Sequence, residues 1–345
     1  SMQKLSKTYP GADKQVLKNI YLSFFYGAKI GILGLGTVGA GVFNVLKRNQ
    51  DEIIRRTGRG IEVVMVCRRN VAAAQEIVGN TVPVVADPNT LINHPEIDVI
   101  VELMGGDTLS KELVLAAIAN GKHIVTANKA LLAVHGTEIF AAANAKGVIV
   151  AFEAAVAGGI PIIKSLREGL SANRIEWVAG IINGTTNFIL TEMQEKGVTF
   201  AKALSEAQSL GYAEADPTFD IEGIDAAHKL TILAGLSFGI PMSFKDVYVE
   251  GITTLEQKDI QYADELGYRI KLLGIAKKRD KGIELRVHPT LIPEKRLIAN
   301  VNGVKNAVLV QAHAVGPTLY YGAGAGAGPT ASAVVADVID IVRDI

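Results

Sequence analysis

The chain has 345 residues, which is long enough for two domains that each bury a hydrophobic core. Lys plus Arg and Asp plus Glu both number 35, so the net charge of zero gives no reason to expect nucleic acid or a membrane surface as a partner. Cys67 is the single cysteine, which excludes an internal disulfide bond and favours a reducing compartment, so we expect a cytoplasmic protein with no targeting segment.

The first 28 residues form an unusual start. Residues 15–25 alternate in hydrophobicity and predict a strand. The runs Lys4–Pro10, Val16–Ile20 and Gly27–Gly34 resemble the opening of an ABC ATPase of the ABC-F kind. However, Gly39-Ala40-Gly41 stands where a Walker A loop needs Gly-Lys-Ser/Thr, which excludes ATP hydrolysis by that mechanism.

We therefore expect residues 1–28 to be an appended segment. One explanation is a chimera, natural or engineered, whose junction falls in the run Lys29–Gly34, and Ser1-Met2 resembles the remnant of a tag. The alternative is an ordinary N-terminal extension.

A glycine-rich turn then joins an apolar run to a helical pattern. Ile30–Leu33 predicts a buried strand, Gly34-x-Gly36-x-x-Gly39 follows, and apolar residues recur at helical spacing toward Ile54. Glycines tolerate positive φ and let a pyrophosphate approach the amides at a helix N-terminus. The pattern is the dinucleotide-binding fingerprint of a Rossmann-type fold, although such turns also occur for packing alone.

The next predicted strand bears on cofactor preference. Ile61–Cys67 is a buried-strand candidate that completes a βαβ unit, and Arg68-Arg69 follows with no carboxylate. An acidic residue at this point binds the ribose 2′-hydroxyl of NAD, whereas an arginine can accept the 2′-phosphate of NADP. NADP is therefore favoured over NAD, with an ordinary solvated arginine pair as the alternative.

Further strands and helices bring polar groups to the same edge of the sheet. The loop Met104-Gly105-Gly106 and the pair Asn128-Lys129 each follow a predicted strand, and open α/β sheets bind ligands at the carboxyl ends of their strands. Lys129 is therefore a candidate site residue, although a lysine at a strand end often faces solvent. The predicted strands are Val82–Val85, Asp98–Leu103, His123–Lys129 and Val148–Phe152, and the helices are Lys111–Asn120 and Ala130–Lys146.

The loop from Glu153 to Pro161, Glu-Ala-Ala-Val-Ala-Gly-Gly-Ile-Pro, leads into a predicted helix, Ile162–Gly169. Carbonyl oxygens turned inward beside one carboxylate suit a hard cation. A simple strand-to-helix turn is the commoner explanation of such a segment.

The densest polar run is Gly211–Lys229, after a predicted strand at Ile175–Ile182 and a helix that Asn183 caps. Asp225 and Lys229 are four residues apart on a helix, so both side chains project from one face. A surface ion pair is the plain alternative. The helix continues through apolar residues, however, and a lysine in such surroundings loses hydration, which lowers its pKa toward the range useful for proton transfer. Glu214 and Asp216 add carboxylates that suit an amino-alcohol substrate.

The last hundred residues predict three strands and two helices. A Gly-Ala run, Gly322–Gly328, precedes the final helix, and Pro329-Thr330 marks its entrance. A final helix that returns to the Rossmann sheet would make the cofactor domain discontinuous. The predicted strands are Asp246–Thr253, Arg269–Arg279 and Ile283–Leu291, and the helices are Thr254–Leu266 and Ala331–Asp344.

From Lys29 onward the chain resembles the homoserine dehydrogenase family, which reversibly oxidises L-homoserine to L-aspartate 4-semialdehyde with NAD(P) on the route to threonine, methionine and isoleucine. The resemblance covers about nine tenths of the chain and rests on five motifs in the family's order: Gly34-Leu-Gly-Thr-Val-Gly39, Thr126-Ala-Asn-Lys129, Glu153-Ala-Ala-Val-Ala-Gly-Gly-Ile-Pro161, Gly211-Tyr-Ala-Glu-Ala-Asp-Pro217 with Asp225-Ala-Ala-His-Lys229, and Gly326-Ala-Gly-Pro-Thr330.

The resemblance implies roles for individual residues. Lys229 is expected to be the proton donor or acceptor, with Lys129 beside the nicotinamide and able to share proton transfer, and Glu214 and Asp225 are expected to bind homoserine. The resemblance also implies a sodium ion held by Glu153 with the carbonyls of Val156, Gly158 and Ile160, which replaces the simple-turn explanation of that loop. Cofactor contacts are expected from Gly34, Gly36, Thr37, Val38, Gly39, Arg68, Arg69, Lys129, Gly211 and Gly326.

The expected architecture is α/β: a Rossmann-type, doubly wound parallel sheet and a second α+β domain for catalysis and dimerisation. The expected boundaries are 29–152, completed by 320–345, for the cofactor domain and 153–319 for the second domain, with no ACT domain and a homodimeric assembly. The competing hypotheses are a nucleotide-binding or ribosome-associated module inherited from residues 1–33, and another NAD(P)-dependent dehydrogenase of similar architecture.

Overall fold

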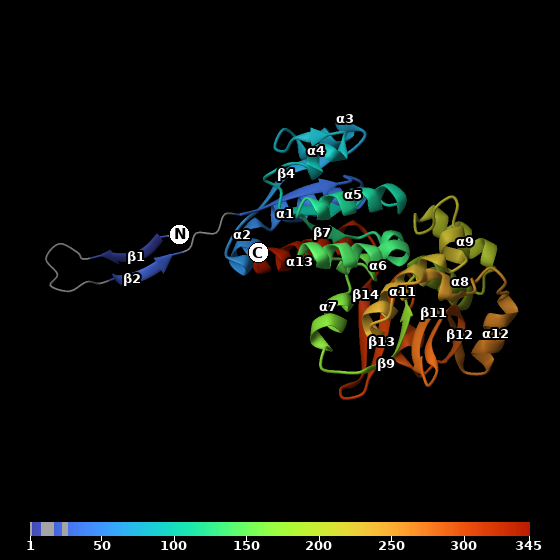
Figure 1. Cartoon of the computed structure of the whole chain (residues 1–345). Helices are drawn as coiled ribbons and strands as arrows, with labels where there is room; N and C mark the ends of the chain where they lie inside the picture. Colours follow the sequence, from blue (N-terminus) through green and yellow to red (C-terminus); the bar gives the residue numbers. More distant parts are fainter. Residues whose placement is uncertain (1, 8–16, 23–26) are drawn as a thin grey trace.

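A computed structural model describes residues 2–7, 17–22 and 27–345. Two six-stranded sheets dominate it, and Figure 1 shows how their strands and helices are arranged. A separate antiparallel pair precedes them, in which β1 (Met2–Lys7) lies beside β2 (Leu17–Leu22). The strand expected at 15–25 is therefore seen as β2, and the rest of that range lies outside the described residues.

The first large sheet is parallel, with the strand order β5-β4-β3-β6-β7-β8. Its central strand, β3, is apolar on both faces: Ile30 and Ile32 contact one hydrophobic cluster and Leu33 the other, since helices cover both sides. This confirms the Rossmann-type sheet. Its strands are β3 (Ala28–Leu33), β4 (Ile61–Cys67), β5 (Val84–Val85), β6 (Val99–Glu102), β7 (His123–Thr126) and β8 (Val150–Ala151).

The helices of this half lie between its strands, in the alternation typical of a doubly wound fold. The helix expected to run to Ile54 is instead two helices, because Asn49 leaves the helical conformation between them. The helices are α1 (Thr37–Arg48), α2 (Gln50–Thr57), α3 (Val71–Val78), α4 (Pro88–Ile92), α5 (Thr108–Ala119) and α6 (Lys129–Lys146).

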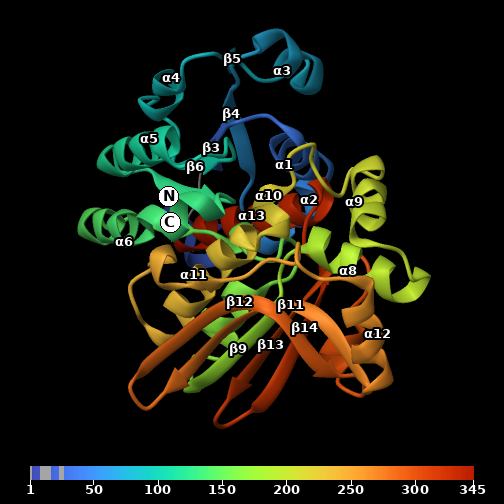
Figure 2. The same ribbon diagram turned by 90° about the vertical axis from the view of Figure 1, so that its right-hand side faces the viewer.

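The second large sheet has the order β10-β12-β11-β9-β13-β14 and is antiparallel except where β10 pairs with β12. Helices α8 (Gly184–Lys196), α11 (Ile224–Phe238) and α12 (Gln257–Glu265) pack on one face. Figure 2 shows α11 between this sheet and the parallel one. The strands are β9 (Ile175–Ile181), β10 (Tyr248–Val249), β11 (Tyr268–Arg279), β12 (Gly282–Pro293), β13 (Lys305–Ala312) and β14 (Gly316–Ala323).

Helices and single helical turns connect the two halves and the strands of the second sheet. They are η1 (Glu153–Ala155), α7 (Ile162–Lys164), η2 (Ser165–Gly169), α8 (Gly184–Lys196), α9 (Phe200–Ser209), α10 (Thr218–Ile221), α11 (Ile224–Phe238), η3 (Phe244–Asp246), α12 (Gln257–Glu265) and η4 (Leu297–Asn300). The strand expected over Asp246–Thr253 is only the two residues of β10, because Phe244–Asp246 forms a helical turn.

The last helix, α13 (Ala327–Asp344), returns to the parallel sheet and packs along α1. Its apolar side, including Val334 and Val338, joins the same hydrophobic cluster as Val42 of α1. Gly41 lies at the crossing: a Cβ on it would stand 2.8 Å from the carbonyl oxygen of Ala327. The two helices can approach this closely only because residue 41 has no side chain.

Filling that crossing should separate the two helices. We expect Gly41→Val to lower the free energy of unfolding by about 1–3 kcal/mol, the usual cost of overpacking, with an earlier urea midpoint. Gly328→Val is the matched control, because Gly328 also lies in a helix and a Cβ on it would meet no atom within 4 Å. Equal stability of the two variants would show that the α1–α13 contact does not hold the fold together.

Candidate active site

The glycine turn after β3 has the geometry of a phosphate-binding loop. Gly34 has φ 95°, in the left-handed region, and a Cβ on Gly39 would stand 2.2 Å from the carbonyl oxygen of Gly34. These two glycines are therefore required by the turn itself. A Cβ on Gly36 would meet no protein atom within 4 Å, and Gly36 is the uncapped N-cap of α1. Free space and unsatisfied amides at a helix N-terminus together suit an anion.

A pocket continues from this turn along the carboxyl edge of the parallel sheet. Gly34 and Gly36 line it with Arg68 and Arg69, and the loop Met104–Gly106 closes its other side. Arg69 is exposed and Arg68 is half-buried, so both guanidinium groups can reach a phosphate from the solvent side. The structure thus brings the expected glycines and arginines to one pocket.

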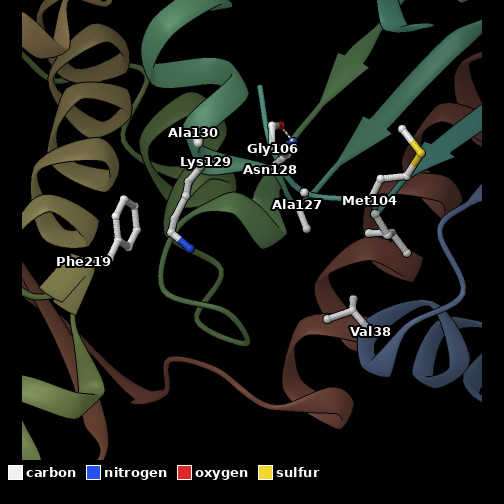
Figure 3. A pocket seen from close by; sticks show the side chains of 10 residues that line it. Val38, Met104, Gly106, Ala127, Asn128, Lys129, Ala130 and Phe219 are labelled. Carbon is white, nitrogen blue, oxygen red and sulfur yellow. Dashed lines mark hydrogen bonds between the residues drawn. The ribbon is translucent and has the colours of Figure 1, made fainter. Parts of the chain in front are cut away.

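A second pocket adjoins the first and shares the Met104–Gly106 loop with it. Val38 lines one side of this second pocket. Figure 3 shows the Lys129 side chain extending from the start of α6 into the pocket, beside the Phe219 ring. The Lys129 ammonium lies 5.7 Å from the centre of the Phe219 ring. Thr37, at the start of α1, is exposed.

A third pocket shares Lys129 with the second and reaches the start of β13 and the end of β14. The expected residues Gly211, Asp225, Lys229 and Gly326 all line it. Shared lining residues thus connect the three neighbouring pockets from the glycine turn to Lys229. The other residues that line the third pocket are Asn183, Gly184, Thr185, Tyr212, Asp220, Val304, Lys305, Asn306, Ala323, Gly324 and Ala325.

The Asp225 carboxylate holds two lysines in this third pocket. Its Oδ2 atom accepts from Lys229 Nζ at 2.7 Å, and its Oδ1 atom lies 3.1 Å from Lys129 Nζ. Lys229 Nζ also donates to the carbonyl oxygen of Ile182 at 2.8 Å, and Asn183 Nδ2 donates to Asp225 at 2.8 Å. Only 12% of the Lys229 side chain and 5% of the Asp225 side chain are exposed, which excludes a plain surface ion pair.

These contacts decide the charge states. Burial alone would raise the pKa of Asp225, but the ammonium groups of Lys229 and Lys129 outweigh it and lower that pKa to about 2. Burial lowers the pKa of Lys229 below that of a free lysine, although Asp225 opposes the shift. The site therefore combines a fixed carboxylate with a lysine that can release its proton more readily.

Sequence reasoning missed Asp220 and gave Asn183 only a capping role. Asn183 does cap α8, since its Oδ1 accepts from the amide of Thr186, but its Nδ2 also bridges Asp220, at 2.7 Å, to Asp225. Burial, and then the neighbouring Asp225 charge, raise the pKa of Asp220. The signal was present, because Asp220 lies inside the polar run that was singled out.

Glu214 is not brought into the third pocket. It lies on an exposed loop, where its carbonyl oxygen accepts a hydrogen bond from the Gln208 side chain. Asp216 instead accepts hydrogen bonds from the amide and hydroxyl of Thr218 at the start of α10. These two carboxylates are therefore apart from Asp225 and Lys229 in this arrangement.

The Glu153 loop is buried between the two halves. The two carboxylate oxygens of Glu153 each accept one backbone amide, from Ile163 and Lys164, both at 2.8 Å. Within the described residues, the buried carbonyls of Val156 and Gly158 accept no hydrogen bond. The same residues contain no group of three or more His, Cys, Asp or Glu side chains that could bind a metal. An ion here would depend on carbonyl oxygens.

Comparison with known proteins decides the family. The sequence profile "Homoserine dehydrogenase" matches residues 161–339, and the profile "Homoserine dehydrogenase, NAD binding domain" matches residues 34–153. The chain belongs to the homoserine dehydrogenase family. It is therefore an NAD(P)-dependent oxidoreductase of amino-acid biosynthesis that interconverts L-homoserine and L-aspartate 4-semialdehyde.

Individual relatives agree with the profiles. The homoserine dehydrogenase of Pseudomonas aeruginosa is 68% identical over 91% of this chain and 72% of its own length. The crystal structure of a homoserine dehydrogenase from Thiobacillus denitrificans is 66% identical, with a TM-score of 0.91 over 92% of this chain and 74% of that chain. A hyperthermophilic archaeal homoserine dehydrogenase in complex with NADPH is 27% identical, with a TM-score of 0.79 over 92% of this chain and 98% of that chain.

The comparisons bear on two further expectations. Neither profile includes residues 1–33, so nothing supports the resemblance of that segment to an ABC ATPase. No helix in the described part of the chain combines the length and the apolar character needed to cross a bilayer.

Proposed function

We propose that Lys229 is the general acid and base of this homoserine dehydrogenase. The nicotinamide supplies the hydride acceptor or donor, and the protein must add or remove one proton at the substrate oxygen. Lys229 supports this assignment because it is buried in the third pocket, bound to Asp225, and has a lowered pKa. As an ammonium it protonates the developing alkoxide during reduction. As an amine it accepts the hydroxyl proton during oxidation.

The neighbouring groups suit the substrate's ammonium and hydroxyl groups. Asp225 and Asp220 are carboxylates that face the third pocket, and Lys129 lies between this pocket and the one beside Val38. We propose that Asp225 binds homoserine and that Lys129 contacts the nicotinamide side and shares proton transfer. We also propose that Glu214 binds homoserine, because its exposed loop begins at Gly211, which lines the third pocket.

Removal of the Lys229 amine tests the central assignment. We expect Lys229→Ala to lower kcat by about 10²- to 10⁴-fold, the usual contribution of a general acid or base, while the Kd of NADPH, measured by fluorescence, stays near the wild-type value. Lys202→Ala is the control, because Lys202 is exposed on α9. Wild-type turnover of Lys229→Ala would remove Lys229 from the mechanism.

The pH dependence has a definite sign. Because the pKa of Lys229 lies below that of a free lysine, the amine form becomes available at lower pH than usual. The oxidation of homoserine should therefore rise with pH through that pKa, and the reduction of the semialdehyde should fall over the same interval. Initial rates at 340 nm in both directions check this. Parallel pH profiles in the two directions would contradict it.

We propose NADP as the preferred cofactor, with Gly34, Gly36, Thr37, Val38, Gly39, Gly211 and Gly326 in contact with it. The first pocket fits NADP for two reasons. Gly36 leaves room for a pyrophosphate, and Arg68 and Arg69 supply positive charge after β4, where no carboxylate follows the strand. The archaeal relative in complex with NADPH supports this choice.

Loss of the two guanidinium groups should lower kcat/KM more for NADPH than for NADH. Hydrogen bonds to charged groups contribute about 1.5–3 kcal/mol, so we expect Arg68→Ala/Arg69→Ala to lower kcat/KM for NADPH by about 10- to 100-fold and for NADH by much less. Arg279→Ala, in a remote exposed ion pair with Glu284, serves as the control. An unchanged ratio between the two cofactors would disprove the 2′-phosphate contact.

A sodium ion is proposed in the Glu153 loop. The loop fits a hard cation because the buried carbonyls of Val156 and Gly158 lack donors from the described residues. The carbonyl of Ile160, the third expected ligand, already accepts the amide of Ile162 at 2.7 Å. Since both Glu153 oxygens already accept amides, the ion depends chiefly on the carbonyls, and Glu153 adds negative charge nearby. Thermal unfolding in sodium chloride compared with choline chloride tests the site, and identical midpoints would reject it.

We propose a division into a cofactor domain, 29–152 completed by the C-terminal segment, and a second domain from 153. The expected boundary between 319 and 320 falls inside β14, which pairs with β13, so the second domain extends to Ala323.

We also propose a homodimer formed through the second sheet. Ile275, Leu309 and Leu319 lie on the sheet face opposite α11 and are partly exposed. A Leu309→Glu variant that keeps the wild-type mass in light scattering would contradict that interface.

Residues 1–28 are proposed to be an appendage, of chimeric origin or an ordinary extension, since neither profile includes them. Ala28 begins β3, so the segment to delete is residues 1–27. Their deletion should leave kcat unchanged. Loss of cofactor binding in that truncation would contradict the proposal.

A further inference from the structure

Glu102 is a buried carboxylate that the site described above leaves without a role. It ends β6, in the middle of the parallel sheet, and is 0% exposed. The three residues before it are Val99, Ile100 and Val101, which are the residue types expected in such a strand. No ion pair joins Glu102 to a lysine or arginine of the described residues. Burial raises the pKa of its carboxyl group. Such a group is expensive to bury, so its contacts call for an explanation.

The carboxylate receives hydrogen bonds from the loop after β6 and from the end of β7. Its Oε1 atom accepts the amide of Met104 at 2.8 Å. The Ser110 hydroxyl lies 3.4 Å from the same oxygen and has a closer acceptor in the carbonyl oxygen of Gly105, at 3.1 Å. Its Oε2 atom accepts the hydroxyl of Thr126, at the end of β7, at 2.7 Å. The Met104 amide and the Thr126 hydroxyl both donate, which matches a carboxylate, since a carboxylate can only accept when ionised.

Thr126 connects Glu102 to the start of α6 through hydrogen bonds. Its hydroxyl oxygen accepts the amide of Asn128 at 3.0 Å, and Asn128 Oδ1 accepts the amide of Leu131 at 3.1 Å, which caps the helix. Asn128 Nδ2 donates to the carbonyl oxygen of Gly106 at 2.5 Å, a bond drawn in Figure 3. The hydrogen bonds therefore close a ring that links Glu102, the Met104–Gly106 loop, Asn128 and Thr126.

The ring lies directly behind the wall of the second pocket. Met104, Gly105, Gly106 and Asn128 line that pocket, and Lys129 follows Asn128 in the chain. Gly105 and Gly106 have φ of 78° and 73°, and two successive glycines have little intrinsic preference for one conformation. This part of the wall thus depends on outside contacts for its shape, and Glu102 supplies them.

We propose that Glu102 is a positioning residue for hydride transfer: it fixes the Met104–Gly106 loop against the nicotinamide and, through Thr126 and Asn128, fixes the end of α6 from which Lys129 extends into the cleft. This inference rests on the proposed cofactor pocket. Glu102 does not line any of the three pockets, so it acts only through the residues that do.

The test compares Glu102→Ala, Glu102→Gln and Thr126→Val in the full chain. A displacement of about 1 Å at reacting groups can cost about 10²-fold in rate. We therefore expect Glu102→Ala to lower kcat and raise the Kd of NADPH, each by about tenfold or more, with a smaller change in the KM of homoserine. Glu102→Gln should recover part of the loss, because its Oε1 still accepts the Met104 amide. Thr126→Val should lower kcat but leave the Kd of NADPH near wild type, since the contact between Glu102 and Met104 remains.

The matched control is Glu138→Gln, which makes the same acid-to-amide change on α6, where Glu138 is exposed and pairs with Lys111. If Glu102→Ala does not fold, the Gln and Val variants decide. The proposal would be overturned if Glu102→Gln and Thr126→Val both kept the wild-type kcat and the wild-type Kd of NADPH. It would also be overturned if their loss of kcat disappeared at a temperature where both variants are fully folded. Gly36→Ala tests the pocket separately: normal NADPH binding by that variant would reject the cofactor site itself.

Discussion

The buried pairing of Asp225 with two lysines is the interaction on which the site depends. Lys129 comes from the helix that follows β7, and Lys229 comes from α11, which packs on the second sheet. One carboxylate therefore joins the two halves of the molecule at the cleft. Leaving a buried charge without its partner costs about 3–5 kcal/mol, so each member of the group keeps the others in place.

The same pairing sets the conditions under which the site stays assembled. The pKa of Asp225 is about 2, below the value of about 4 for a free aspartate, so its ionisation stabilises the folded state at neutral pH. That contribution is present above the unfolded pKa and is lost as the pH falls toward 2. Lys229 differs, because burial lowers its pKa while Asp225 raises it. A proton can thus leave the lysine without loss of the carboxylate's charge.

Elements with strong local signals could be predicted from the sequence. Ile61–Cys67 agrees with β4 residue for residue, and Asn183 caps α8 as its type and position predict. The strands β13 and β14 were missed, since the apolar run of β13 lacks alternation and Gly316, Pro317 and Gly322 in β14 resemble turns. Their identity depends on pairing with β9 and with each other, which the local sequence does not encode. In the site too, local contacts could be predicted and distant ones could not. Asp225 and Lys229 share one helix, whereas Asp220 is linked to Asp225 through Asn183, which lies 37 residues before Asp220 in the chain.

The return of α13 to the parallel sheet has a consequence for how the chain acquires its structure. Val334 and Val338 share a hydrophobic cluster with Val42, so the core around α1 is complete only when the last helix is present. During synthesis on the ribosome, the β3–α1 unit emerges almost three hundred residues before the helix that covers it. The amino-terminal half therefore cannot finish folding as an independent unit while the rest is being translated. The apolar face of α1 stays exposed until α13 has been synthesised, and exposed apolar surface is what chaperones bind.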